Sequence, residues 1–264
     1  MKRIVLISIV VLFALTALSF TAGKSVILRI RPYKDNVYVI KSCTKSTMTM
    51  KYQGQSMITD ATTEERQSFF AKEVSENNNV FETQLDAFKT TIKQMGQTLT
   101  YDTDNPQNNS PMLAQGGYAA YDTIIKRPNN VTYDCFGHMQ ESDSIAVSNL
   151  SSVMIELPEN EITVGSEWTY IHPQDFNYFK AYWNMHVNVL EIKKKYVVLS
   201  ITGTADIPEA NATGTSEGTW TIDLNTGIVI NSINKFNATM TYSEYGLTVT
   251  ADVSGTTTIN VEEQ

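Results

Sequence analysis

The side chains of this chain that could do chemistry are three histidines, two cysteines and several acidic residues. His138, His172 and His186 are scattered, and no HExxH or CxxC spacing accompanies them, so the sequence does not support a zinc site. Glu64 and Glu65 are adjacent, which in a strand turns their carboxylates to opposite faces and prevents them from acting as a glycosidase pair. Neither a GxSxG elbow nor a phosphate-binding glycine loop occurs. We therefore expect no enzyme and no catalytic residue, and keep enzymatic function as a third alternative.

A second candidate for metal chemistry is the run Asp-Thr-Asp-Asn at residues 102–105. Alternate oxygens in such a run could ligate one hard cation, as in a calcium loop. The run lacks the glycine and the closing glutamate that a complete loop of this kind contains. We expect a solvated turn here, and we predict no metal ligand and no cofactor.

Cys43 and Cys135 are the only cysteines of the chain. In an oxidising compartment an even number favours pairing, and a bridge closing a loop of roughly 90 residues could stabilise the fold by about 4–5 kcal/mol. The alternative is two unpaired, buried thiols. One sequence does not show whether the two sites meet, so both alternatives stay open.

Methionine and aromatic residues are the remaining candidates for function. Methionine is an adaptable apolar lining, and aromatic side chains crowd two loop-like segments near residues 118–121 and 170–183. If the sheet curves, such residues could line an apolar cavity; if it is packed solid, they form the core. The candidates for ligand lining are Met48, Met50, Met112, Tyr118, Tyr121, Tyr182, Trp183 and Met185.

The elements that must position these residues are long strands joined by tight turns. Trp220 and Ile222 alternate with polar residues, Asp223 to Gly227 turns the chain, and Ile228 resumes the period of two. Asp223 can accept hydrogen bonds from the N–H groups of the turn, and Gly227 can take a positive φ. The pattern continues to the longest expected strand, residues 247–261, and predicts a mainly β fold: a long antiparallel meander forming a curved sheet or half-barrel with one short helix.

Earlier parts of the chain give less regular signals. Alternation at residues 26–30 suggests a first strand, and a return strand is expected within residues 55–74, although residues 60–66 also resemble a capped helix start. Ser110 followed by Pro111 predicts the short helix through residues 112–114. Strand character is expected again at residues 123–125.

Residues 1–23 have the layout of a signal peptide. Lys2 and Arg3 form a positive start, residues 4–20 are hydrophobic, and small residues follow. The alternative is an uncleaved anchor, since the apolar run is close to the shortest that spans a bilayer. We predict a single β-rich domain at residues 24–264, with pseudo-repeat halves of about 24–145 and 146–264 as a further hypothesis, and no transmembrane segment after cleavage.

Composition limits the partners. The chain has 264 residues, 42% of them hydrophobic, which is enough to bury a core. Its formal net charge of −8 argues against binding to nucleic acid or to an anionic membrane surface. We expect an exported protein, periplasmic or extracellular.

Several turn and strand motifs are familiar as a set. They are Leu157-Pro158, residues 164–168 (VGSEW) and residues 218–228, together with the turns at residues 51–55 and 96–102. Together they resemble an uncharacterised family of exported Gram-negative envelope proteins, a domain of unknown function, over about residues 25–262. The layout is also similar to the half-barrel periplasmic carriers of lipoproteins or lipids. The resemblance implies fold and export, and it carries over no catalytic residue.

These features are compatible with two functions. The first is non-enzymatic binding of an apolar ligand or a lipidated client protein in a curved β-sheet. The second is a surface or extracellular module that contacts protein or glycan and has a solid core. A continuous apolar cavity on the concave face of the sheet would favour the first function.

Overall fold

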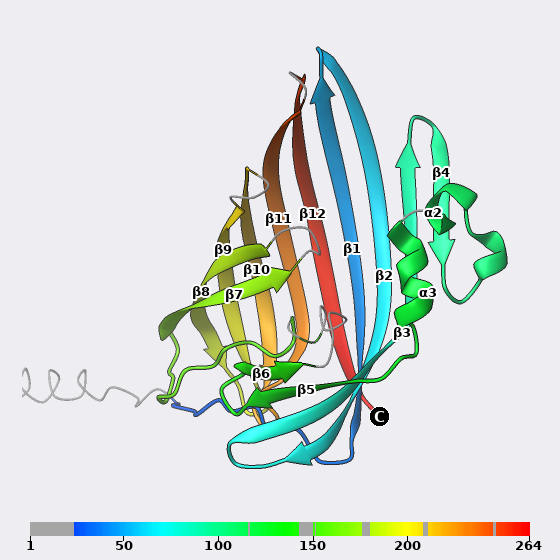
Figure 1. The fold of residues 1–264 in the computed structure, drawn as a ribbon. Helices are drawn as coiled ribbons and strands as arrows, with labels where there is room; N and C mark the ends of the chain where they lie inside the picture. Colours follow the sequence, from blue (N-terminus) through cyan, green and yellow to red (C-terminus); the bar gives the residue numbers. More distant parts are fainter. Residues whose placement is uncertain are drawn as a thin grey trace, which may run out of the picture.

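Strands from the two ends of the described chain pair at the centre of one sheet. In the computed structural model, which describes residues 24–115, 117–142, 150, 152–175, 180–207, 211–244 and 247–264, β1 (Val37–Tyr52) runs antiparallel to β12 (Leu247–Glu263). Their register extends from Tyr38 opposite Glu263 to Tyr52 opposite Val249. This pairing joins an N-terminal and a C-terminal meander (Figure 1). The expected signal peptide lies outside the described residues.

The rest of the sheet extends outwards from this central pair. Beyond β1 lie β2 (Gln55–Val74), β3 (Asn78–Gln94), β5 (Asn129–Asp134) and β6 (Met139–Ser142), while β4 (Gln97–Asp102) pairs with another part of β3. Beyond β12 lie β11 (Val229–Glu244), β10 (Ala212–Asp223), β9 (Tyr196–Ile207), β8 (Lys180–Ile192) and β7 (Glu167–Asp175). The result is one 12-stranded antiparallel sheet that ends at β6 and β7 without closing. The predicted fold class, an open curved antiparallel sheet, is confirmed.

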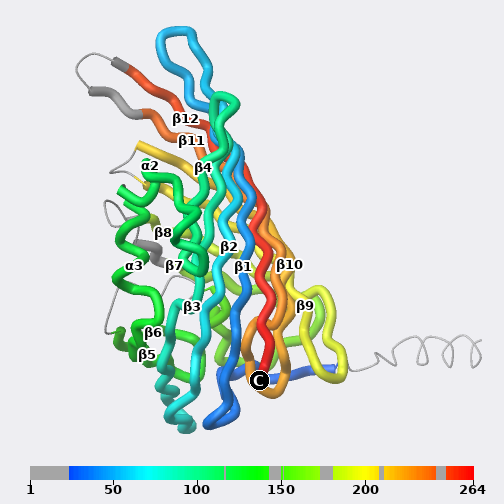
Figure 2. Tube along the Cα trace, turned by 90° about the vertical axis from the view of Figure 1, so that its right-hand side faces the viewer, coloured from blue at the N-terminus to red at the C-terminus, as the bar shows by residue number. Residues whose placement is uncertain are grey.

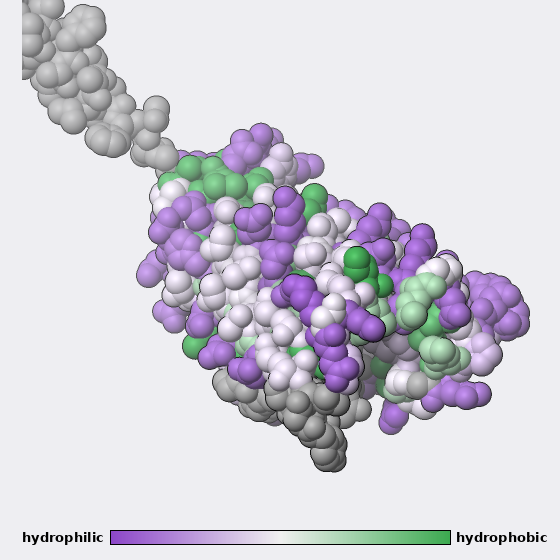
Figure 3. Space-filling view, turned by 90° about the horizontal axis from the view of Figure 1, so that it is seen from above, coloured by the Kyte–Doolittle hydropathy of each residue, from purple (hydrophilic) through white to green (hydrophobic). Residues whose placement is uncertain are grey.

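The two faces of the sheet differ in what covers them. Alternate residues of each strand belong to the inner face, which carries Ile40, Ile259 and Trp220, or to the outer face, which carries Lys41 and Thr221. The main hydrophobic core consists of inner-face residues and the segments packed on them. The helical segment, β5, β6 and β7 lie on the inner side (Figure 2). The surface seen from above shows hydrophobic residues only in small separate groups (Figure 3).

The segment at residues 26–30, expected as a first strand, is not one. Only Val26 forms an isolated bridge, with Ile162, and the N–H of Ile30 donates to the carbonyl of Cys135 at 2.8 Å. Leu28 and Ile30 are nevertheless fully buried. The alternation in the sequence therefore reflects the burial of one side of an extended segment. The segment is not a strand, because its backbone hydrogen bonds go to several different partners rather than to one neighbouring strand.

A second non-repetitive segment completes the core. Val153, Ile155 and Leu157 are buried, and the N–H of Leu157 donates to the carbonyl of Phe136 at 2.7 Å. The indole N–H of Trp168 in β7 donates to the carbonyl of Glu156 at 2.9 Å. These bonds fix residues 152–157 against the inner face.

The helical segment is short. It contains η1 (Pro106–Asn108), α2 (Pro111–Ala114), η2 (Gly117–Ala120) and α3 (Tyr121–Ile124). The predicted helix at α2 is confirmed, although the Ser110 hydroxyl accepts the N–H of Thr100 at 2.9 Å instead of capping the helix. In the part of the chain that the structure describes, no helix has the length and apolar character needed to cross a membrane.

The strand expected at residues 123–125 is wrong, because α3 occupies residues 121–124. The ring of Tyr121 stacks on Phe88 of β3 with centroids 3.7 Å apart, and the Tyr101 hydroxyl donates to Asp122 at 2.6 Å. These contacts require Tyr121 and Asp122 to lie close together over the sheet. A helical turn provides that placement, whereas a strand would separate the two side chains onto opposite faces.

The turn between β10 and β11 has the predicted chemistry. One carboxylate oxygen of Asp223 accepts the N–H groups of Asn225 at 2.9 Å and Thr226 at 3.0 Å. Gly227 has φ +69° and donates its N–H to the carbonyl of Asp223 at 2.8 Å. The backbone of Arg29 crosses directly over this glycine. The turn therefore also supports the buried N-terminal segment.

We predict that Gly227→Ala destabilises the protein more than Gly54→Ala does. Both glycines have positive φ, which costs about 1–2 kcal/mol for alanine, but a Cβ at Gly227 would lie 2.1 Å from the carbonyl oxygen of Arg29, while nothing lies within 4 Å at Gly54. Urea unfolding of the two variants measures the difference, which we expect to exceed about 1 kcal/mol. Equal losses of stability would show that the N-terminal segment does not rest on this turn.

Candidate functional site

A cavity of about 410 Å³ opens on the inner face between β1, β7, β8 and β10–β12. Its volume and largely apolar lining fall in the range of small-molecule sites. Side chains from six strands and one from the segment at residues 152–157 contribute to it. The lining residues are Thr44, Ser152, Tyr170, His172, Trp183, Met185, Ser216, Trp220, Asn234, Phe236, Thr257 and Ile259.

Glycines on the inner face create the space for the large lining side chains. A Cβ at Gly255 would lie 2.5 Å from the ring of Phe236, and one at Gly203 would lie 2.8 Å from the sulfur of Met185. Real Cβ atoms do not approach other atoms so closely. Phe236 and Met185 can therefore lie flat across neighbouring strands, which shapes the floor of the cavity.

Two pairs of polar groups in the cavity lining lie within hydrogen-bond distance of each other. The indole N–H of Trp220 donates to the side-chain oxygen of Asn234 at 2.6 Å, and the hydroxyls of Thr44 and Thr257 are 2.9 Å apart. Burial lowers the pKa of His172 below its usual value of 6.5. At neutral pH the lining therefore offers hydroxyl, amide and neutral imidazole groups within an apolar surface.

The structure brings together only some of the lining residues predicted from sequence. Trp183 and Met185 line the cavity. Met48 and Met50 are half-buried on the same inner face, farther along β1, opposite Val253 and Ala251 of β12.

The other candidates lie elsewhere. Tyr118 and Tyr121 pack with Phe88 under the helical segment, and Met112 and Tyr182 are exposed. Tyr170, from the aromatic segment at residues 170–183, also lines the cavity, whereas sequence reasoning did not select His172, Trp220, Phe236 and Ile259 as lining residues. The available signal was the placement of glycines such as Gly203 and Gly255 at inner positions of otherwise regular strands.

The aromatic cluster under the helical segment is filled. Phe88, Tyr101, Tyr118 and Tyr121 contact one another, with centroids 5.8 Å apart for Tyr101 and Tyr118. Desolvation and the neighbouring Asp122 raise the pKa of the Tyr101 hydroxyl, which donates to that carboxylate. This cluster attaches the helical segment to β3 and β4.

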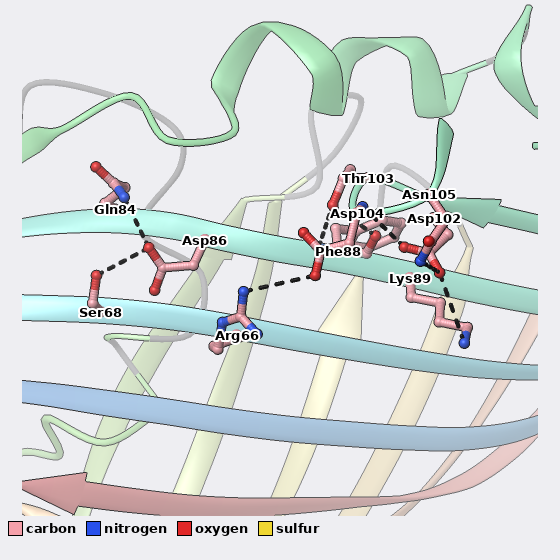
Figure 4. A network of polar contacts seen from close by, with 10 residues as sticks. All are labelled: Arg66, Ser68, Gln84, Asp86, Phe88, Lys89, Asp102, Thr103, Asp104 and Asn105. Atoms are coloured by element: carbon pink, nitrogen blue, oxygen red, sulfur yellow. Dashed lines mark hydrogen bonds and ion pairs between the residues drawn. The ribbon is translucent and has the colours of Figure 1, made fainter. Parts of the chain in front are cut away.

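The acidic run at residues 102–105 belongs to a network of hydrogen bonds and ion pairs (Figure 4). Asp102 accepts the N–H of Asp104 at 2.9 Å and the side-chain amide of Asn105 at 3.1 Å, and Lys89 lies 3.8 Å away. Arg66 lies 3.7 Å from Asp104. The carboxylates are thus occupied by cations and N–H groups, as expected of a turn.

The cysteines do not form the bridge considered from their even number. Cys43 and Cys135 are both free thiols. Cys43 lies in the middle of β1 on the outer face, opposite Glu64 and Thr258, whereas Cys135 follows β5 and is buried where its carbonyl accepts the N–H of Ile30. Cys43 lies on the outer face of the sheet and Cys135 lies beside the N-terminal segment on its inner side, so the two thiols do not meet.

The remaining histidines lie beside carboxylates. His138 contacts Asp134 at 2.7 Å and Glu156 at 3.6 Å, and His186 lies 3.5 Å from Glu167. Across the residues with described placement, no group of three or more histidine, cysteine or acidic side chains is arranged to hold a metal ion.

Comparisons with known proteins identify no family. No protein-family model and no curated protein matches this sequence, so the resemblance to exported envelope proteins stays a prediction. An outer membrane channel from Pseudomonas putida F1 is similar at 6% identity and TM-score 0.35, covering 89% of this chain and 98% of that chain. The CymD monoaromatic hydrocarbon channel is similar at 7% identity and TM-score 0.24, covering 86% and 88%.

The translocator domain of the autotransporter NalP from Neisseria meningitidis is similar at 8% identity and TM-score 0.21, covering 84% of this chain and 88% of that chain. At such TM-scores the similarities carry no argument about this protein. Its function is therefore inferred from the geometry of the cavity.

We predict that His172 makes the fold less stable in mild acid. Burial lowers the pKa of the His172 imidazole in the folded protein. Below about pH 6.5 the unfolded chain therefore binds more protons at this residue than the folded chain does. The free energy of unfolding should therefore fall as the pH drops below that value, and His172→Gln should reduce this slope. Denaturant unfolding at several pH values measures the effect, with His186→Gln at an exposed position as the control. An unchanged slope in His172→Gln would contradict the assignment.

Proposed function

We propose that this protein binds an apolar ligand, an acyl chain of a lipid or of a lipidated protein, in the inner-face cavity, without catalysing a reaction. The observation that supports the proposal is the cavity of about 410 Å³ lined by Tyr170, Trp183, Met185, Trp220 and Phe236. A single domain of this size ordinarily fills its core to the density of an organic crystal. An apolar hollow in such a face is typical of a ligand site.

The inner face beyond the cavity supports a long ligand. Met240 and Ala238 of β11 and Met48 and Met50 of β1 continue the apolar surface along the strands, and each of them is half-buried. Flexible thioethers adapt to irregular apolar partners. A chain seated against Trp183 and Phe236 can therefore extend along this surface.

Export fits the same proposal. The predicted signal peptide and the acidic composition suit a carrier that works in the envelope or outside the cell, where an apolar chain needs shelter from water. The alternative, an interaction module with a solid core, is favoured less because the inner face is hollow beside β7 and β8.

We predict that Ser216→Trp abolishes ligand binding. Ser216 lines the cavity from β10, and an indole at this position fills the hollow between Met185 and Phe236. Thr215→Trp, one residue away on the exposed outer face, is the matched control. Binding is measured with Nile red, an uncharged apolar dye, and by native mass spectrometry of the protein purified from its own source.

The expected result is at least a tenfold loss of dye affinity and loss of any co-purified adduct in Ser216→Trp only, with circular dichroism unchanged. Equal dye binding by both variants would sink the proposal. So would an absence of dye binding by the wild-type protein.

A further inference from the structure

Charge is distributed unequally between the two faces of the sheet. The twelve residues that line the cavity include no lysine, arginine, aspartate or glutamate. In strands β1, β2, β3 and β11 the basic residues of the described registers all belong to the outer face. They are Lys41, Lys45, Lys51, Arg66, Lys72, Lys89, Lys93 and Lys235.

Five of the outer basic residues have acidic partners. Lys41 pairs with Glu262 at 2.7 Å and Lys51 with Asp252 at 3.2 Å, both across the β1–β12 ladder. A lysine side chain of the outer face could reach the cavity only by breaking such an ion pair and crossing the backbone of the sheet. Among the described residues of the lining, no lysine or arginine is therefore available to pair with an anionic ligand, and the imidazole of His172 is kept neutral at neutral pH by its burial.

Glu65, in contrast, belongs to the inner face. It lies opposite Ser42 of β1, which in turn lies opposite the cavity residue Ile259 of β12. On its other side Glu65 lies opposite Phe88 of β3, on which Tyr121 stacks. The pKa of Tyr121 is raised to about 12 by burial and by the negative charge of Glu65, which agrees with this placement. Thr44, the inner-face residue of β1 next to Ser42, lines the cavity, so Glu65 lies one strand spacing and one two-residue step, roughly 8 Å, from the nearest lining residue.

We propose that the site selects acyl chains that carry an uncharged polar head group and rejects amphiphiles with an anionic head group. This inference rests on the proposed function. An anionic head group entering the cavity would lose hydration without gaining a cation, which is strongly unfavourable. The carboxylate of Glu65, half-buried on the same inner face, would add repulsion.

The polar groups of the lining suit an uncharged head group. The hydroxyls of Thr44, Thr257 and Ser216 can donate and accept hydrogen bonds, and the Asn234 amide can donate while it accepts from Trp220. An ester, a hydroxyl or an amide can use these groups without any change of charge. A monoacylglycerol is the simplest probe with this chemistry.

The experiment compares a monoacylglycerol, the fatty acid and the alkylamine of one chain length, each below its micelle concentration, as competitors of Nile red. We expect the fatty acid, fully ionised at the pH used, to bind at least tenfold more weakly than the monoacylglycerol. In Glu65→Gln the fatty acid should recover several-fold in affinity, while the affinity for monoacylglycerol stays unchanged. Glu64→Gln, the neighbouring carboxylate on the outer face, is the matched control and should change neither.

Other outcomes overturn the inference. Equal or tighter binding of the fatty acid by the wild-type protein shows that the head group is not selected by charge. Tighter binding of the alkylamine than of the monoacylglycerol shows that Glu65 recruits a cation instead. If Nile red binds and no acyl compound competes, this inference fails while the proposed apolar site stands; if Nile red does not bind, the proposed function itself fails.

Discussion

Coverage of the inner face is the constraint on which the rest of this structure depends. A wide open sheet with apolar residues on one face must bury that face against something else. Leu28 and Ile30 cover one part, residues 152–157 another, and the helical segment covers β3 and β4 through Tyr121. The cavity lies beside these segments, between Trp183, Met185 and Phe236 of the sheet and Ser152 of the segment at residues 152–157.

Local pattern in the sequence was enough to predict the strands and turns. A return strand was expected within residues 55–74, where β2 lies, and the turn from Asp223 to Gly227 has the predicted hydrogen bonds. The pairing of β1 with β12 was not predictable, because alternation shows which residues share a face but not which distant strand lies alongside. The strand predicted at residues 26–30 was wrong for a related reason. These residues alternate and one side of the segment is buried, but their backbone forms only an isolated bridge and no ladder with a neighbouring strand.

The candidate site was predictable only in part for the same physical reason. Trp183 was identified from the aromatic residues around it in the sequence, and Met185 from its adaptable apolar side chain. Trp220 and Phe236 join them only through the register that places β10 and β11 between β9 and β12. A cavity built from six strands has no contiguous sequence signature, and inner-face glycines are its nearest trace.

The inner and outer faces of the sheet also differ in charge. Lysines, threonines and carboxylates lie on the outer face, with ion pairs such as Lys41–Glu262 across strands. The inner face keeps its polar groups uncharged near the cavity. This division follows from strand alternation, because a shift of the register by one residue would move every side chain of a strand to the opposite face.

The central claim is that the inner-face cavity is where an apolar chain binds. The most direct test is photo-crosslinking of the intact protein with an uncharged acyl ester that carries a diazirine at the end of its chain, followed by peptide mapping. The account predicts labelled peptides from β8 and β11 containing Trp183, Met185 and Phe236, and loss of labelling in competition with the unlabelled ester. Labelling spread over outer-face residues, or labelling that the ester does not displace, would contradict it.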